Sequence, residues 1–313
     1  MKILVITSPG EDYLADMALY GMRKRYGAAC VDWPKKDVMY KSCARSKASL
    51  YGRGFTMWKL LDDAAVDREQ VSERLAANNF DVVVFTSIHR QLDHYTALTE
   101  RGLLDRAELR FLDGEDVGCH SVKSALRRGP YFKREEPFVP DVRPVSFAIP
   151  KEKLFTAPSA KSRFFGTHVQ CEEAYRHPWI ALNCRGRVGD GYAFQEEDPY
   201  RTDLAASYYA ITGKKAGWDC LRHYEQAASF AVPCFYQLGL KSRNSAPHGL
   251  IDGENCVVFD TSDELILKTT SILESGLYEG LMRGAGAWAA DRTCEALADY
   301  IIKAGSPGPF GPV

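Results

Sequence analysis

The sequence lacks long hydrophobic runs. Its longest apolar stretches, such as Val82–Phe85, are far shorter than the ~20 residues with which a helix spans a bilayer. The apolar segment Ile3–Ile6 has only the length of a strand, and no cleavage site of small residues follows it, so it does not resemble a signal peptide. We therefore expect a cytoplasmic protein without a membrane-spanning helix. Peripheral contact with a membrane is compatible with these features.

Cysteine pairs, an excess of charge and a dinucleotide motif are also missing. The nine cysteines form no Cys-x-x-Cys pair and are odd in number, which is typical of free thiols in a reducing compartment. The 40 basic and 41 acidic residues leave a net charge of -1, which argues against a nucleic acid partner. No Gly-x-Gly-x-x-Gly follows the first apolar segment, and this argues against a dinucleotide-dependent enzyme.

What is present is an alternating α/β pattern. The chain has 313 residues, 45% of them hydrophobic, which suffices for two domains with packed cores. An apolar segment at 2–7 ends in a turn, and the segment at 11–26 then places its apolar residues on one helical face. Phe80–Thr86 is apolar without polar alternation, which is typical of a strand buried on both faces of a parallel sheet.

These patterns predict an α/β fold of two tandem Rossmann-like domains that face each other across a cleft. We place the domains at 1–150 and 151–304, followed by a flexible Gly/Pro-rich tail at 305–313, and the C-terminal helix could cross back to the first domain. The expected strands lie at 2–7, 28–32, 80–86, 108–112, 145–149, 162–169, 231–235 and 255–259. The expected helices lie at 11–26, 68–77, 172–182, 202–209, 219–229, 263–274 and 278–302.

Candidate phosphate-binding residues gather where one helix is predicted to begin. Two lysines ending at Lys215 precede the helix predicted at 219–229. The free N–H groups and partial positive charge of a helix N-terminus bind phosphate, and Lys215 and Arg222 could complete the neutralisation. Glu225 could accept hydrogen bonds from a ribose diol. The alternative is structural, because Asp219 could simply cap this helix and pair with the basic residues.

The sequence downstream of Lys215 resembles the donor domain of GT-B glycosyltransferases. In that superfamily a helical Glu with small residues after it precedes a Val-Pro strand, a Gly/Pro turn, an Asp-Gly-Glu-Asn-type hairpin, a short strand and a long helix. The matching segments here are Glu225–Ala228, Val232–Pro233, Ala246–Gly249, Asp252–Asn255, Cys256–Phe259 and Asp263–Leu265. Phe111–Asp116 and Tyr131–Glu135 narrow the resemblance to the bacterial spore-maturation-type, family-1-like glycosyltransferases.

The resemblance implies roles for residues of the second domain. Glu225 would contact the ribose of a nucleotide-diphosphate sugar, and Lys215 and Arg222 would hold its diphosphate. The turn that contains His248 and Gly249 would lie against the donor sugar. The donor is then a co-substrate, and the resemblance implies neither a resident cofactor nor a bound metal.

One position departs from the pattern of the retaining members. They have a second Glu eight residues before the ribose-binding one, and this sequence has Gly217 there. We count Gly217 and Asp219 among the donor-binding residues, but Asp219 could replace the missing carboxylate only with a different geometry. The stereochemical outcome therefore stays open.

The first domain offers candidates for proton transfer and for acceptor binding. Asp113, Glu115 and Asp116 follow an apolar segment, where a general base or an acceptor-binding carboxylate would lie, although a solvated acidic turn explains them as well. His89 follows the buried strand at 80–86 and is directed at the same cleft. We predict Asp113 and His89 as catalytic residues. Ser8, Gly10 and Glu115 are predicted on the acceptor side.

The sequence as a whole predicts a glycosyltransferase that moves a sugar from a nucleotide-diphosphate donor to a glycan or glycoconjugate. A nucleotide-sugar epimerase of the same architecture is an alternative, distinguished by turnover of donor without acceptor. A non-catalytic nucleotide- or glycan-binding protein is another, because Gly217 lacks a carboxylate. Glycosylation of a modified DNA base is a third, against which the near-neutral charge argues.

Overall fold

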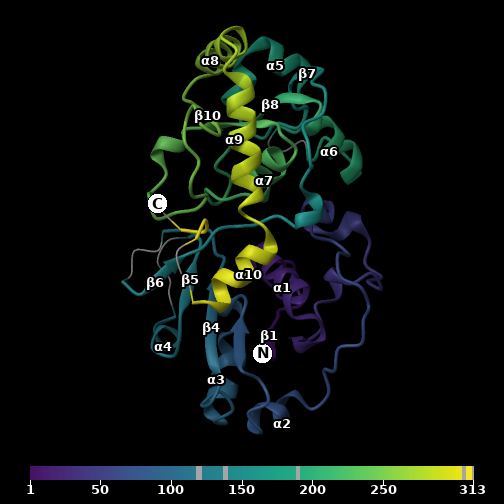
Figure 1. Cartoon of the computed structure of the whole chain (residues 1–313), viewed down its shortest axis with the longest axis vertical. Coiled ribbons are helices and arrows are strands. Elements are labelled where there is room, and N and C mark those ends of the chain that lie inside the picture. The colour runs from purple at the N-terminus through teal and green to yellow at the C-terminus, as the bar shows by residue number, and fades with distance from the viewer. Residues whose placement is uncertain (118–121, 137–139, 188–190, 305–307, 312–313) are drawn as a thin grey trace.

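A computed structural model of the chain describes residues 1–117, 122–136, 140–187, 191–304 and 308–311. Two lobes, each built on a parallel sheet with helices around it, are joined into one molecule (Figure 1). We call residues 1–150 the first half and residues 151–313 the second half. The sheet of the first half ends at Pro144 and that of the second half begins at Arg163. A domain boundary at residue 150 falls between them and stays a prediction.

The first half contains a six-stranded parallel sheet, and all four residues of its central strands β1 and β3 are buried, as an apolar run without alternation predicts. In spatial order the strands are β2 (Cys30–Trp33), β1 (Ile3–Ile6), β3 (Val82–Phe85), β4 (Glu108–Asp113), β5 (Tyr131–Lys133) and β6 (Val142–Pro144). Its helices are α1 (Tyr13–Tyr26), α2 (Val71–Ala76), α3 (Leu92–Glu100) and α4 (Lys123–Leu126).

The second half contains a four-stranded parallel sheet. In spatial order its strands are β10 (Val257–Phe259), β9 (Val232–Tyr236), β8 (Ser207–Gly213) and β7 (Arg163–Phe165). Its helices are α5 (Pro178–Asn183), α6 (Glu197–Ala205), α7 (Leu221–Ala228), α8 (Ser262–Glu274), α9 (Tyr278–Ala290) and α10 (Cys294–Ile302). Because strands of both sheets are parallel, their carboxyl ends and the loops after them gather at one edge of each sheet.

The last helix crosses to the first half, as predicted. α9 lies in the lobe of the second half, and α10 continues beside α1 in the other lobe (Figure 1). The two helices approach so closely at Gly21 that a Cβ there would overlap the backbone carbonyl of Cys294. Side chains of α1, α7, α9 and α10 belong to one continuous apolar cluster, so the two halves share a core.

Four predicted elements are wrong. The single helix expected at 278–302 is interrupted at residues 291–293, so it forms the two helices α9 and α10. The helix expected at 202–209 ends at Ala205, and Ser207–Gly213 forms β8, a central strand of the second sheet. Residues 145–149 form no strand, and β5 and β6 take that place at the sheet edge. The helix expected at 172–182 is a short 3-10 turn at Ala174–Arg176 followed by α5, because Pro178 has no N–H to continue a helix and begins a new one.

The remaining sequence predictions concern the tail, the cysteines and the membrane. Of the tail at 305–313 the structure describes 308–311. Phe310 in this segment is buried, and its ring centroid lies 5.5 Å from that of Tyr300. The eight cysteines in the described residues are free thiols, all buried except the half-buried Cys220, and Cys119 lies outside the described residues. Within the described parts of the chain, none of the helices has both the length and the apolar character needed to cross a bilayer.

Candidate functional site

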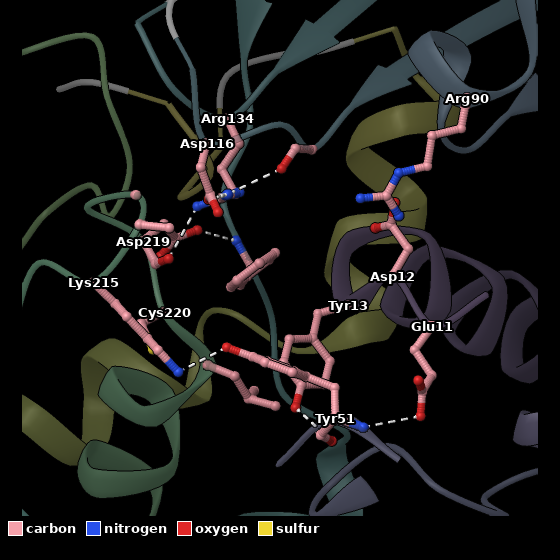
Figure 2. A pocket seen from close by; sticks show the side chains of 15 residues that line it. Glu11, Asp12, Tyr13, Tyr51, Arg90, Asp116, Arg134, Lys215, Asp219 and Cys220 are labelled. Carbon is pink, nitrogen blue, oxygen red and sulfur yellow. Dashed lines mark hydrogen bonds and ion pairs between the residues drawn. The ribbon is translucent and has the colours of Figure 1, made fainter. Parts of the chain in front are cut away.

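A cavity of about 360 Å³ lies between the two halves at the carboxyl ends of their strands. The loops after β1, β4 and β5 form its first-half wall, and Lys215–Gly217 and Asp219–Leu221 form its second-half wall. Figure 2 shows side chains from both halves directed into this space. The volume falls within the ~300–1,000 Å³ typical of small-molecule sites.

The first-half wall begins directly after β1. Glu11 and Asp12 line the cavity, and Asp12 caps α1 by accepting a hydrogen bond from the N–H of Ala15 at 3.2 Å. The same carboxylate accepts a hydrogen bond from Ser87 at 2.7 Å and pairs with Arg90 at 3.3 Å. Asp12 is therefore engaged by its own half and has little freedom to bind a ligand.

The predicted acceptor-side residues Ser8 and Gly10 lie in the turn just before this wall and are not among its lining residues. Their carbonyl groups accept hydrogen bonds from the buried ammonium of Lys36, which also pairs with Asp16 at 3.1 Å. The pKa of Asp16 is raised to about 6, because burial outweighs the attraction of Lys36. Lys36 thus binds the backbone of this turn from its buried side.

The second-half wall contains one lysine, Lys215. The Lys215 ammonium donates a hydrogen bond to the Tyr51 hydroxyl at 2.8 Å, which joins the two walls (Figure 2). α7 begins at Leu221 next to the cavity, and the side chain of its N-cap Cys220 makes no capping hydrogen bond. A helix start without a side-chain cap leaves N–H groups available to an anion.

Arg222 lies in the first turn of α7 with its guanidinium buried. Its Nη1 donates to the Gln170 side chain at 2.6 Å, whereas its Nη2 has no hydrogen-bond partner in the described part of the chain. Gln170 and Lys214 line a second, open cavity of about 560 Å³ on the second half alone, beyond β7, β8 and β9. Lys214 and Lys215 therefore lie between the two cavities.

Arg134 connects the two walls. Its guanidinium is 2% exposed, pairs with Asp116 and Glu135 of its own half, and donates to the carbonyl of Asp219 in the second half at 3.0 Å. Glu135 in turn accepts the backbone N–H of Asp219 at 3.0 Å. Burial raises the pKa of Glu135 to about 7, although Arg134 opposes this shift. These contacts hold the loop before α7 against the first half.

Gly217 lies where this contact is tightest. A Cβ at Gly217 would overlap the carboxylate of Glu135 and lie 2.6 Å from Oδ1 of Asp116. Glycine is needed here for space. The side chain of a Glu at this position, as in the retaining members of the similar superfamily, would need room that two carboxylates of the first half already occupy.

Asp219 lines the cavity, but both oxygens of its carboxylate accept hydrogen bonds from neighbouring residues. Oδ1 accepts a hydrogen bond from Tyr224 at 2.9 Å and Oδ2 accepts the N–H of Phe147 at 2.7 Å. Burial raises its pKa. The structure places Asp219 before the start of α7, where its carboxylate fastens the loop to the first half instead of capping the helix.

Glu225 is 3% exposed and lies behind the cavity, one turn farther along α7. It accepts hydrogen bonds from Thr56 of the first half and from Tyr200 at 2.9 Å. Burial raises its pKa, and these two donors and the nearby Arg201 oppose the rise. A ribose could reach this carboxylate only after Thr56 and the segment around it had moved.

The predicted catalytic group of the first half is a buried cluster. Asp113 is fully buried, 3.3 Å from the Lys133 ammonium and 2.8 Å from the Tyr131 hydroxyl. His89 lies 3.5 Å from Asp113 and 3.5 Å from Glu115, so the structure brings the three predicted residues together. Burial lowers the pKa of His89, and the two carboxylates oppose this effect. The cluster adjoins the cavity through the loop that contains Gly114.

His248 and Gly249 lie away from the cavity wall. The carbonyl of His248 accepts hydrogen bonds from Trp288 at 2.8 Å and Arg292 at 3.0 Å. Burial, assisted by Lys241 and Arg292, lowers the pKa of His248 to about 3. Gly249 has a φ of 71°, and a Cβ there would lie 2.7 Å from the Arg292 guanidinium. This turn is fastened to α9.

Several cavity residues were not predicted from the sequence. Glu11, Asp12 and Tyr13 directly follow the predicted turn after β1, and the rule that ligands bind beyond the carboxyl ends of strands could have found them. Tyr51 comes from a loop between β2 and α2, and no local signal marks it. The described residues contain no group of three His, Cys, Asp or Glu side chains able to hold a metal ion.

The fold defines the class of this molecule, a two-lobed α/β protein of the GT-B-like architecture, as predicted. The chain is similar to HepE from Anabaena in its complex with UDP, with a TM-score of 0.58 and 12% identity over 97% of this chain and 99% of that one. The HepE complex with UDP-glucose gives a TM-score of 0.54 and 11% identity over 97% and 98%. A glycosyltransferase from Rickettsia africae gives 0.54 and 9% over 96% and 97%. Neither protein-family models nor curated protein sequences match this chain.

Proposed function

We propose that this protein is a glycosyltransferase that uses a nucleotide-diphosphate sugar. The observation that carries the proposal is the cavity between the halves, whose second-half wall combines Lys215 with the uncapped start of α7. Such a wall suits a diphosphate, because free N–H groups and a cation together neutralise it. HepE, a protein of the same fold, forms complexes with UDP and UDP-glucose. The order of motifs that resembles the spore-maturation-type group supports the same assignment.

On the donor side, Lys215 and the first turn of α7 hold the diphosphate in this proposal. Arg222 supports them from below with a guanidinium that has unused hydrogen-bonding capacity. Glu225 keeps its proposed role at the ribose only if the donor displaces Thr56. His248 and Gly249 would act through the turn that α9 holds, rather than by lining this cavity.

On the acceptor side, the hydroxyl of a glycan or glycoconjugate attacks the anomeric carbon of the donor sugar. The sugar–phosphate bond breaks, and its electron pair leaves with the nucleoside diphosphate toward Lys215. Asp113, His89 and Glu115 are not among the residues that line the cavity, so Asp113 and His89 stay candidates for supporting this step from behind the loop that contains Gly114.

The proposal is tested with a panel of UDP, GDP, CDP, ADP and dTDP and their common sugar conjugates. Binding is measured by calorimetry and thermal shift with the wild type, Lys215→Ala and the exposed control Lys123→Ala, without metal and then with manganese. A ligand at 100 times its Kd adds about 2.7 kcal/mol to stability, which shifts a melting curve by several degrees.

We expect one nucleotide to bind the wild type and Lys123→Ala, and to bind Lys215→Ala about 10-fold or more weakly, since a charge-assisted hydrogen bond contributes about 1.5–3 kcal/mol. The sugar conjugate of that nucleotide should then be consumed with transfer to an acceptor. Absence of binding by every nucleotide contradicts the proposal, and donor turnover into an isomeric sugar nucleotide without acceptor would show an epimerase instead.

A further inference from the structure

The carboxylates that line the cavity differ in how much hydrogen-bonding capacity they have left. Both oxygens of Asp12 are used by Ala15, Ser87 and Arg90. Both oxygens of Asp219 are used as well. Only Glu11 and Asp116 combine a place in the cavity wall with an oxygen that has no partner among the described residues.

Asp116 and Glu11 lie at different places in this wall. Glu11 accepts the N–H of Tyr51 at 3.2 Å, and both residues belong to the first half. The side chain of Asp116 is 43% exposed, and it lies next to Arg134 and Asp219 in Figure 2. Its Oδ1 would lie 2.6 Å from a Cβ at Gly217. Of these two carboxylates, Asp116 is therefore the one that lies against the loop of the second half.

Arg134 gives Asp116 a defined orientation. The guanidinium binds Oδ1 of Asp116 and also the carbonyl of Gly114 at 2.9 Å, so it holds the loop after β4 at two points. The same guanidinium is fastened to the second half through the carbonyl of Asp219. A side chain so held is preorganised with respect to a ligand on Lys215 and α7, and preorganisation is what proton transfer in a site requires.

We infer that Asp116 is the proton acceptor for the attacking acceptor hydroxyl; this inference rests on the proposed glycosyltransferase function. The hydroxyl proton passes to Oδ2 of Asp116 as the hydroxyl oxygen bonds to the anomeric carbon. The bond from that carbon to the diphosphate oxygen breaks, and the leaving group takes the electron pair. Because the attacking hydroxyl becomes strongly acidic as it bonds to an oxocarbenium-like carbon, a carboxylate suffices as its base.

The geometry at Gly217 supports this inference. The loop of the second half carries no carboxylate at residue 217, and the space beside its Cα is filled by Asp116 and Glu135 of the opposite half. Glu135 is buried and engaged by Arg134 and Asp219, so Asp116 is the member of this pair that the cavity exposes.

The inference is tested with Asp116→Asn, which keeps the size of the side chain and an oxygen for Arg134 but cannot take the proton. Asp93→Asn, an exposed substitution on α3, is the matched control. Binding of the nucleotide that the wild type selects is measured by calorimetry. Turnover of its sugar conjugate is measured as nucleoside diphosphate released, with water, lactose, maltose and cellobiose as acceptors.

We expect Asp116→Asn to lower kcat about 100-fold or more, the usual contribution of a general base, and to change the Kd of the nucleotide less than about threefold. Asp93→Asn should match the wild type in both. A kcat of Asp116→Asn within about threefold of the wild type overturns the inference and leaves the proposed function intact. Equal losses of nucleotide affinity and kcat overturn it too, because Asp116 would then act in donor binding. A wild type that binds no nucleotide or releases none from any donor rejects the proposed function and this inference with it.

Discussion

The two halves share an α/β architecture but place different charged groups at the carboxyl ends of their strands. The first half places three carboxylates in the cavity wall, Glu11, Asp12 and Asp116, and pairs the last two with Arg90 and Arg134. The second half places Lys215 there, which donates to the Tyr51 hydroxyl, and Asp219, whose two oxygens are both engaged. The loops alone make this difference. In the proposed function, the first-half wall receives the proton and the second-half wall holds the anionic leaving group.

Buried and exposed carboxylates of this protein also differ in how many of their oxygens are engaged. Glu225 and Asp113 are buried and surrounded by donors, so each stabilises a contact between elements. Asp116 is held at one oxygen, and its other oxygen has no partner within the part of the chain that the structure describes. A carboxylate in a motif thus acquires its role from the partners that tertiary structure gives it.

The largest expected effect comes from breaking the crossover that ties the second half to the first. In Gly21→Ala the new methyl group overlaps the carbonyl of Cys294 and must push α10 away from α1. We expect the free energy of unfolding to fall by about 3 kcal/mol, measured by urea denaturation. Gly280→Ala in α9 is the control, since nothing lies within 4 Å of its Cβ, and alanine should stabilise this helix by about 0.5–1 kcal/mol. A loss in both variants or in neither would show that the crossover contact is not the cause.

The next effect concerns the contact between the walls at Glu135. Its pKa is raised from 4.5 to about 7 in the folded protein, so the folded state holds the proton more tightly than the unfolded state. The resulting stabilisation is fully present below pH 4.5 and is lost as the pH rises through 7. The free energy of unfolding of Glu135→Gln relative to the wild type should therefore rise between pH 4.5 and 7, by about 3 kcal/mol at most.

This comparison is made by urea denaturation at several pH values, with the exposed Glu100→Gln as control. The charged groups around residue 135, which are Arg134, Asp219 and Lys241, are present in both the wild type and Glu135→Gln. The effect of their titration on stability therefore largely cancels when the two free energies of unfolding are subtracted. A difference between Glu135→Gln and the wild type that stays constant with pH would contradict the prediction.

A smaller effect is expected at Gly217, where the two walls touch. Gly217→Ala forces a methyl group against the carboxylates of Glu135 and Asp116, and we expect it to lower the free energy of unfolding by about 2 kcal/mol. Gly10→Ala, in the turn of the first half, places its Cβ in open space and should have almost no effect on stability. Denaturant unfolding of both variants measures the contrast. Equal free energies of unfolding for the two variants would mean that the contact between the walls at Gly217 can open without lowering stability.

The smallest expected effect concerns Thr56, the first-half partner of Glu225. Thr56→Val keeps the shape of the side chain but removes the hydroxyl that Glu225 accepts, and we expect a loss of about 1 kcal/mol in the free energy of unfolding. Thr56→Ser keeps the hydroxyl and should lose less. If Thr56→Ser destabilises the protein as much as Thr56→Val, the methyl group and not the hydrogen bond is responsible.

Much of the fold could be predicted from apolar patterns. Strands such as β1 and β3 are continuous apolar runs, and a buried parallel strand needs nothing else to be recognised. β8 was mistaken for the end of a helix, because Tyr208 and Tyr209 follow α6 without a glycine or proline to mark the boundary. The failure at 145–149 has another cause, since an apolar run does not show whether a sheet edge is free to pair with it.

Part of the candidate site followed from the same patterns. Lys215, Gly217 and Asp219 were predicted near a helix start, and all three line the cavity. Tyr51 and Arg134 were not placed there, because their positions depend on contacts with the other half. The roles proposed for Glu225 and Asp113 depended on exposure, which a motif does not encode.

The sequence by itself determined that this protein folds as two α/β units with a basic helix start in the second, because apolar periodicity and helix-terminus chemistry are local properties. Only the tertiary structure decided which charged groups face the cavity. Burial and hydrogen bonding engage Asp113 and Glu225 away from the cavity wall, whereas Asp116, Lys215 and the fully engaged Asp219 line it. That outcome depends on how residues far apart in the chain pack together, and the free-energy cost of leaving a buried polar group unpaired determines which of them are engaged.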